Sequence, residues 1–184
     1  MGGRRMKDEA LAARCRALRL VVSDVDGVLT DGTVLLLPDG GEAKAFHTRD
    51  GLAVVLAHRA GLRTALLSGR SSEAVARRAR ELGIAIVRQG VSDKAAAFAE
   101  ILAGLGLRPH EAAYIGDDVN DLPAMVQAGL SAAPADGAFE VKAQAYMVTD
   151  ARGGHGCFRE FVEAILRARG EWESLMQTIG AALP

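Results

Sequence analysis

Two aspartates separated by one residue follow an apolar run early in the chain. The run is Arg19-Leu-Val-Val-Ser23, which predicts a β-strand, and Asp24 and Asp26 come directly after it. The ends of strands in α/β sheets present reactive groups to a ligand crevice. Two acids this close repel each other, and both stay ionised cheaply only if a cation lies between them or one holds a proton. The pair therefore suits a metal site combined with acid/base chemistry.

These residue types fit the transfer of a phosphoryl group. The carboxylate of Asp24 can attack phosphorus and form an aspartyl-phosphate that water later hydrolyses. Asp26 is close enough to protonate the leaving alcohol and then to activate that water. Gly27 allows a sharp turn that brings its amide toward phosphate oxygens. The alternative is a strand that ends in an acidic turn, which is common for a single Asp.

Two further segments supply phosphate-binding groups. Ser68 and Gly69 follow an apolar run, and Ser68 offers a hydroxyl and backbone amides at a predicted helix N-terminus, which attracts anions. Lys94 falls in the first turn of another predicted helix, where a cation is unfavourable unless an anion shares the site. Alone, each is as well explained by an ordinary helix start or a solvated lysine. Together with the acids they favour a phosphate site.

A second acidic run, Gly116-Asp-Asp-Val-Asn-Asp121, also follows a short apolar stretch. Its three carboxylates lie within five residues and need a cation or strong solvation. Hard oxygen ligands of this kind suit Mg²⁺, held by one or two carboxylates together with phosphate and water. Asp117 and Asp118 are the better metal candidates, and Asp121 is expected to cap the helix or hold Lys94. The alternative is an acidic helix cap.

Apolar runs of strand length alternate with helical segments along the chain. This order predicts βαβ units, and therefore an α/β fold with a mostly parallel sheet. Strands are expected at 19–24, 63–68, 84–88, 112–116, 130–133 and 145–149, and helices at 50–60, 71–82, 93–104, 119–128 and 156–168. Asp50, Ser72 and Asp93 stand at predicted helix starts, and Gly61, Gly83 and Gly106 at predicted helix ends.

A hairpin flap is predicted at 33–46, because a Pro-Asp-Gly tract separates two β-compatible runs. We divide the chain into a basic leader or short helix at 1–18, a core at 19–168 and a tail at 169–184. No gap between core elements holds the ~50 residues of an independent cap domain. Something else must close the site. Trp172 and Leu175-Met176 lie in the tail, which predicts either an interface segment or a disordered end.

Composition limits the classes of function. With 184 residues and 49% hydrophobic content the chain can bury one core, and a net charge of −1 gives no general attraction to nucleic acid or to anionic lipid. No run approaches the ~18 apolar residues of a membrane helix. Cys15 and Cys157 lack a neighbouring ligand pattern, which argues against a disulfide framework or zinc site and favours a cytoplasmic protein.

In order and spacing, the four motifs resemble those of the haloacid dehalogenase superfamily of phosphohydrolases, over roughly residues 18–168. The resemblance implies a Rossmann-like three-layer core with Asp24 as nucleophile and Asp26 as acid/base. It also implies Ser68 and Lys94 on the transferring phosphoryl group. Mg²⁺ would be bound by the Asp24 side chain, the Asp26 carbonyl and Asp117.

The longer stretches 24–32, 46–51 and 153–160 resemble the cap-less branch of that superfamily, whose members are typically homotetramers in which a neighbouring subunit covers the active site. This implies Mg²⁺-dependent hydrolysis of an 8-phosphorylated octulosonate on the way to lipopolysaccharide. An acylneuraminate 9-phosphate or a broad range of sugar phosphates is the alternative, and a non-catalytic interaction module is the rival of another class. Thr30 and Arg49 are expected to contact the substrate or support the site, and His155 either reaches a substrate carboxylate or is simply a loop histidine. His155 stands where the octulosonate enzymes usually carry Arg, and Thr48 where they carry an apolar residue.

Overall fold

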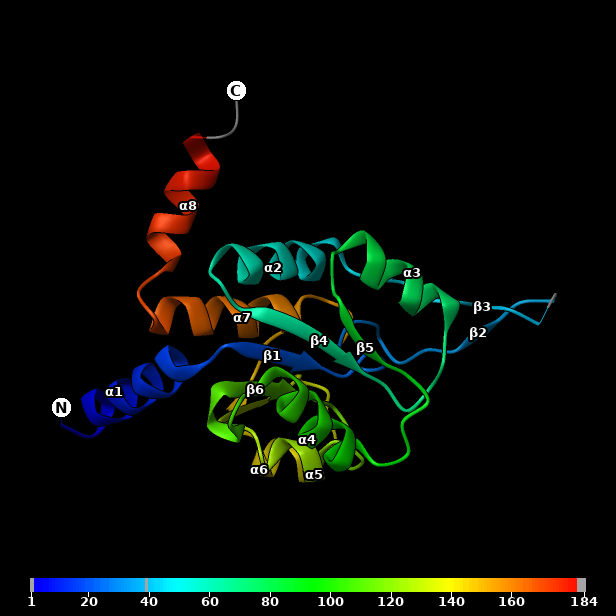
Figure 1. The fold of residues 1–184 in the computed structure, drawn as a ribbon, viewed down its shortest axis with the longest axis horizontal. Coiled ribbons are helices and arrows are strands. Elements are labelled where there is room, and N and C mark those ends of the chain that lie inside the picture. The colour runs from blue at the N-terminus through cyan, green and yellow to red at the C-terminus, as the bar shows by residue number, and fades with distance from the viewer. Residues whose placement is uncertain (1, 39, 182–184) are drawn as a thin grey trace.

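The computed structural model describes residues 2–38 and 40–181, in which a parallel six-stranded sheet lies between two helical layers (Figure 1). The strand order is β5-β4-β1-β6-β7-β8. These strands are β1 (Leu20–Ser23), β4 (Arg63–Leu67), β5 (Ile86–Arg88), β6 (Ala112–Ile115), β7 (Leu130–Ala133) and β8 (Met147–Val148). The prediction of an α/β core with a mostly parallel sheet is confirmed.

Alternate side chains of each central strand belong to two separate hydrophobic clusters, one on each face of the sheet. In β1, Val21 packs on one face, while Leu20 and Val22 pack on the other. The first face is covered by α2 (Thr48–Arg59), α3 (Glu73–Glu81) and α7 (Cys157–Ala168), and the second by α4 (Lys94–Leu105), α5 (Leu122–Met125) and α6 (Phe139–Gln144) (Figure 1). The strands therefore have both faces buried, as three-layer folds require.

Cap residues explain most helix boundaries. Asp93 accepts a hydrogen bond from the amide of Ala96 at 2.9 Å at the start of α4, and Gly106 ends that helix with a φ of 63°. The predicted cap at Asp50 is wrong, because α2 begins at Thr48 with His47 as its N-cap. The carboxylate of Asp50 instead accepts the amide of Arg159 at 2.8 Å, and so caps α7 from a neighbouring helix.

Some elements differ from the predicted ones. The helix expected at 119–128 is reduced to α5, and α6 and the 3₁₀ helix η1 (Pro109–Glu111) were not predicted. The leader forms α1 (Gly2–Ala17) and the tail forms α8 (Trp172–Ala181). Trp172 is only 7% exposed and belongs to the core cluster under α7. The first turn of α8 is therefore part of the packed fold.

The flap is an antiparallel pair of short strands, β2 (Leu35–Leu36) and β3 (Glu42–Ala43), that extends beyond the carboxyl edge of the sheet (Figure 1). Leu37 and Gly41 close it with a backbone hydrogen bond of 2.9 Å, while Asp39 of the predicted turn lies outside the described residues. In the described part of the chain, no helix is long and apolar enough to cross a membrane.

Candidate active site

The parallel register brings three of the predicted motifs to one edge of the sheet. Ser23, the last residue of β1, pairs with Leu66 of β4 and with Ile115 of β6. The residues that follow these strands, Asp24, Ser68 and Asp117, therefore emerge side by side. The chain passes from β5 across β1 to β6 at this point, and such a reversal of strand order is where open α/β sheets bind ligands.

Lys94 reaches this edge from the start of α4 and contacts two carboxylates. Its Nζ lies 3.1 Å from Asp24 Oδ2 and 2.6 Å from Asp121 Oδ1, and the side chain is buried. Burial alone would lower the pKa of Lys94, but the charges of Asp24 and Asp121 outweigh it and raise the pKa. The lysine stays protonated, with its ammonium beside the predicted nucleophile.

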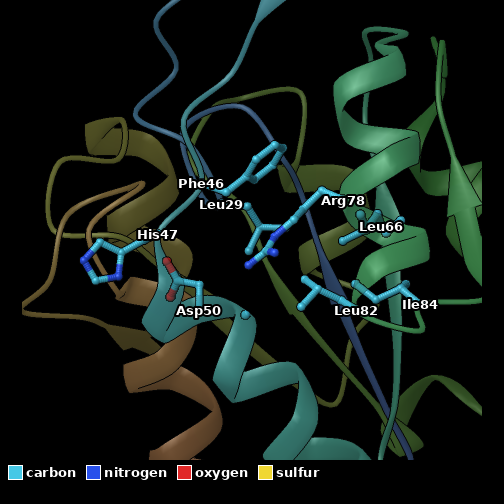
Figure 2. A pocket seen from close by; sticks show the side chains of 10 residues that line it. Leu29, Phe46, His47, Asp50, Leu66, Arg78, Leu82 and Ile84 are labelled. Atoms are coloured by element: carbon cyan, nitrogen blue, oxygen red, sulfur yellow. The ribbon is translucent and has the colours of Figure 1, made fainter.

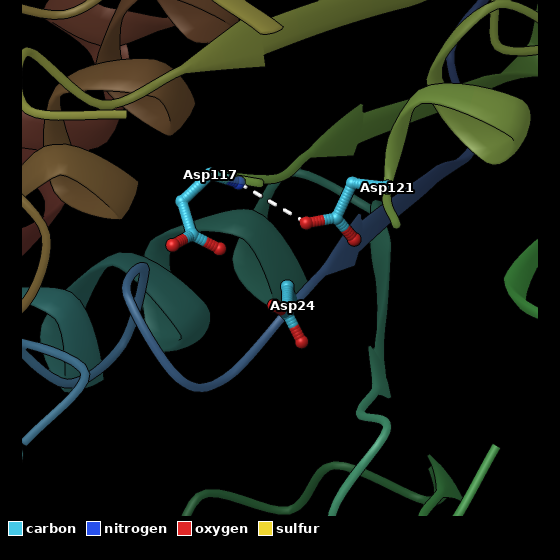
Figure 3. A group of neighbouring side chains, drawn as sticks. All are labelled: Asp24, Asp117 and Asp121. Atoms are coloured by element: carbon cyan, nitrogen blue, oxygen red, sulfur yellow. Dashed lines mark hydrogen bonds between the residues drawn. The ribbon is translucent and has the colours of Figure 1, made fainter. Parts of the chain in front are cut away.

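Asp121 organises the site through both of its carboxylate oxygens. Oδ1 accepts hydrogen bonds from Lys94 and from the hydroxyl of Tyr114 at 2.7 Å, and Oδ2 accepts the amides of Asp117 at 3.1 Å and Asp118 at 3.4 Å (Figure 3). A Cβ on Gly116 would lie 2.4 Å from Asp121, so the tight turn requires glycine there. Asp121 thus holds Lys94 and the acidic loop together, as expected, while the contribution of Tyr114 had no sequence signal.

Carboxylate oxygens of Asp24, Asp117 and Asp121 lie within 4.8 Å of one another (Figure 3). Burial, together with the charge of Asp121, raises the pKa of Asp24 and raises that of Asp117 to about 6. Lys94 compensates only one of three negative charges. Because both oxygens of Asp121 already accept hydrogen bonds, Asp24 and Asp117 are the carboxylates left to hold a cation. Their hard oxygen atoms fit Mg²⁺.

Asp118 differs from its neighbour. It lines the cleft, but it is exposed, lies outside the acid cluster and accepts the amide of Val119 at 2.7 Å. Its role as a metal ligand stays a prediction, and the geometry favours Asp117 over Asp118 for that role.

Glycines allow the acidic loops to approach one another. Gly27 has a φ of +86°, and a Cβ there would lie 2.0 Å from Asp117 Oδ2. A Cβ on Gly153 would lie 2.0 Å from the Gly27 carbonyl oxygen, so the loop that begins at Gly153 packs directly against the turn at Gly27. Gly27 therefore makes room for Asp117 whether or not its amide contacts phosphate.

An open cleft of about 550 Å³ lies over these groups. It is lined by Asp24, Asp26, Gly32, Ser68, Gly69, Arg70, Lys94, Asp117, Asp118 and Asn120. Ser68 and Gly69 are in place, but the expected helix N-terminus at Ser68 is wrong because α3 begins only at Glu73. Arg70 was missed, although its position directly after Ser68-Gly69 at a strand end was a usable signal.

The residues expected around the substrate divide into two groups. Thr30 is buried beside Asp26, with its Oγ1 3.5 Å from Asp26 Oδ1, and so supports the predicted acid/base residue. Arg49 and His155 are exposed, and neither lines the cleft of the single chain. Their contact with substrate stays a prediction that needs another subunit or another state of the loops.

A second, largely apolar pocket lies at the base of the flap (Figure 2). Phe46 enters it from the flap, and Arg78 reaches toward it from α3, while Asp50 lies at its side on α2. A Cβ on Gly51 would lie 2.4 Å from Arg78 Nη2, so this crossing needs glycine. The pocket anchors the flap by burying Phe46, and the chemistry belongs to the polar cleft.

Comparisons with known proteins agree with this geometry. The family described as haloacid dehalogenase-like hydrolase matches residues 39–129. The 3-deoxy-D-manno-octulosonate 8-phosphate phosphatase KdsC of Yersinia pestis is 41% identical over 160 residues, which cover 87% of this chain and 86% of that protein. The chain belongs to the haloacid dehalogenase-like hydrolases.

Solved structures of other hydrolases share the whole fold. The octulosonate 8-phosphate phosphatase of Moraxella catarrhalis, solved with magnesium, phosphate and KDO, superposes with a TM-score of 0.89 at 36% identity, covering 92% of this chain and 97% of that one. The cobalt-bound phosphatase of Haemophilus influenzae has a TM-score of 0.84 at 39% identity, covering 86% of this chain and 93% of that one.

Proposed function

We propose that this hydrolase is a Mg²⁺-dependent phosphomonoesterase that converts 3-deoxy-D-manno-octulosonate 8-phosphate to the free sugar acid and phosphate. The observation that carries the proposal is the placement of Asp24, buried beside Lys94 and Asp117 at the edge of the sheet. The relatives of Yersinia pestis and Moraxella catarrhalis supply the substrate class.

The residues of the chain divide the reaction into two steps. A carboxylate oxygen of Asp24 attacks phosphorus, the bond from phosphorus to the sugar oxygen breaks, and Asp26 gives its proton to that oxygen. Asp26 then takes a proton from a water molecule that attacks the aspartyl-phosphate, which releases phosphate and restores Asp24. Both carboxyl groups return to their starting state.

Charge stabilisation falls to the groups that line the cleft. We expect Lys94, Ser68 and Gly69, which line the cleft, to contact the transferring phosphoryl group from the side of β4 and α4. Mg²⁺, held by the carboxylates of Asp24 and Asp117 and the carbonyl of Asp26, with Asp118 beside them, would neutralise phosphoryl oxygens and acids alike.

We place the enzyme in the cytoplasm as a homotetramer whose subunits complete each other's sites. The apolar side chains of 34–37 on the flap are exposed, with Leu36 at 74%, and a small cluster of this kind on a projecting hairpin favours an interface. Arg49 and His155 then have a neighbouring site to serve. Cys15 and Cys157 are both free and buried, in keeping with a reducing compartment.

A phosphate-release screen tests the proposal. Wild-type enzyme with Mg²⁺ is offered octulosonate 8-phosphate, acylneuraminate 9-phosphate, neutral sugar phosphates and a generic aryl phosphate. We expect the highest kcat/KM for octulosonate 8-phosphate. A preference of about tenfold or more for neutral sugars, which is about 1.4 kcal/mol of transition-state binding, would overturn the substrate assignment. No turnover of any ester would instead support a non-catalytic module.

A further inference from the structure

A closed ring of alternating charges joins the flap to the catalytic edge of the sheet. Its acids are Asp26, which follows β1, and Glu42 of β3, and its cations are Lys44 of the flap and Arg70, which follows β4. The Lys44 ammonium contacts Asp26 Oδ1 and lies 3.6 Å from Glu42 Oε1. Arg70 lies 2.9 Å from Glu42 Oε2 and 4.0 Å from Asp26 Oδ2. Each cation thus bridges a flap acid and a core acid.

Lys44 is the most deeply placed member of the ring. Its side chain is 1% exposed, although residues 33–38 and 40–41 of the same flap are exposed to solvent. Glu42 faces Lys44 through Oε1 at 3.6 Å and Arg70 through Oε2 at 2.9 Å, so both cations compensate its charge. Separating such groups would leave a buried charge unpaired, which is costly. The ring therefore fixes the flap against the core.

The two oxygens of Asp26 have different surroundings. Oδ1 contacts the Lys44 ammonium and the Thr30 hydroxyl, whereas Oδ2 has Arg70 Nε at 4.0 Å, which is beyond hydrogen-bond distance. Holding Oδ1 sets the rotation of the carboxyl group and leaves Oδ2 for the proton exchanged with the leaving oxygen or with water. A fixed orientation serves Asp26 both as acid and as base.

Lys44 reaches Asp26 from outside the cleft. It does not line the catalytic cleft, but borders a separate depression with Phe46, Ala74, Arg77, Arg78 and Glu81. A lysine that bound phosphate directly would have to face the cleft, as Lys94 does. The charge of Lys44 acts on the reaction through Asp26.

We propose that Lys44 is a positioning residue for the acid/base Asp26, so that docking of the flap and alignment of the acid depend on the same contact. The inference rests on the proposed function only in that Asp26 acts as acid and base. Nothing in it depends on which sugar phosphate is the substrate.

Rapid-mixing measurements of leaving-group release during phosphorylation of Asp24 test this role. An alkyl phosphate, whose leaving alcohol needs a proton, is compared with 4-nitrophenyl phosphate, whose leaving group does not. We expect Lys44→Met to slow release from the alkyl ester about tenfold and from the aryl ester less than about threefold. Lys44→Arg should restore most of the rate. Arg77→Met is the matched control, because Arg77 borders the same depression yet is 77% exposed and pairs with Glu81.

A double variant separates positioning from direct action. In an Asp26→Asn background there is no acid to orient, so adding Lys44→Met should change the alkyl ester rate by less than about twofold. If the rate losses of Asp26→Asn and Lys44→Met multiply in the double variant, the proposal is overturned. Equal losses on the alkyl and aryl esters in Lys44→Met would also overturn it, and Lys44 would then be a substrate-binding or purely structural residue.

Hydrogen exchange of the flap amides gives a readout without turnover. We expect faster exchange over 33–46 in Lys44→Met than in wild type or Arg77→Met, and unchanged exchange would overturn the link to the flap. If wild type hydrolyses aryl and alkyl esters but not octulosonate 8-phosphate, the substrate assignment fails and the Lys44 comparison still holds.

Discussion

Two charged clusters, one with Asp24 and the other with Asp26, differ in how their charges are balanced. The buried cluster sets the carboxylates of Asp24, Asp117 and Asp121 against the single ammonium of Lys94. The ring at the base of the flap sets Glu42 and Asp26 against two cations, so its charges cancel when Asp26 is ionised. The first cluster therefore carries an excess of negative charge, and the second carries none.

This difference separates a binding site from a positioning device. Burial and the charge of Asp121 raise the pKa values of Asp24 and Asp117, because they make the ionised carboxylates unfavourable. A bound cation would stabilise those ionised carboxylates. The ring needs no ligand, because every charge in it already has an opposite neighbour. Substitutions in the buried cluster should therefore change metal binding and chemistry, and substitutions in the ring should change geometry.

The largest effect is expected for Asp24→Asn. Turnover should fall by roughly 10⁴-fold or more, because an amide is a very poor nucleophile. The metal-free variant should be at least as stable as wild type, since one buried negative charge is removed while Asp121 still pairs with Lys94. Phosphate release and thermal unfolding check both points. Activity within tenfold of wild type would exclude Asp24 as the nucleophile.

Asp117→Ala should shift the Mg²⁺ titration of activity to at least about tenfold higher concentration, because one of very few protein ligands is lost. Asp118→Ala is the matched control. Since Asp118 is exposed and outside the buried cluster, its loss should have a smaller effect. The reverse order in the two titrations would assign the metal to Asp118.

Stabilisation by Mg²⁺ should depend on pH through Asp117. Its pKa of about 6 in the fold lies above its ordinary value of 3.8, so the folded metal-free protein binds this proton more tightly than the unfolded chain. The charged carboxylate therefore costs stability as the pH rises through this window, and Mg²⁺ relieves the cost at pH 7.5. At pH 5 the cation must displace the proton, so the Mg²⁺-induced rise in Tm should be smaller by roughly 3 °C. Scans at matched ionic strength measure it, and equal rises in Tm at the two pH values would contradict it.

The buried cluster was predictable from sequence because its residues follow strand ends. In a parallel sheet, strand ends converge at one edge whatever the order of strands, so the positions of Asp24, Ser68 and Asp117 follow from local patterns. Lys94 is recognisable because a cation opens a helix there. Both predictions need only the residues adjacent in sequence and the fact that the carboxyl ends of parallel strands meet at one edge of the sheet.

The ring was not predictable, because it depends on contacts between a flap and two loops that are distant in sequence. Lys44 stands in a short exposed hairpin, where lysine is ordinarily a solvated residue. Its burial is decided by how the flap docks. The prediction for Asp50 was wrong for the same reason, because Asp50 caps α7, whose own N-cap residue, Gly156, has no side chain. Trp172 likewise joins a core that the local sequence of the tail does not reveal.

The packing of Trp172 determines where the tail can be truncated without disturbing the core. A truncation at a permitted position tests whether a neighbouring subunit supplies the lid. Cutting after Arg169 would remove Trp172, whose ring lies under the guanidinium groups of Arg159 and Arg167 at 5.0 and 4.8 Å. A cut after Met176 keeps this contact and the partly buried Leu175.

The shorter truncation should leave Tm within about 2 °C of wild type and have the smallest kinetic effect of the series. If the tail of one subunit covers the cleft of another, KM for the sugar phosphate should rise a few-fold, while kcat/KM for a small aryl phosphate stays unchanged. Sedimentation of the same samples reports the oligomer. A wild-type monomer with full activity, or a truncation that harms both substrates alike, would show that the cleft and its balanced ring work without a lid from a neighbour.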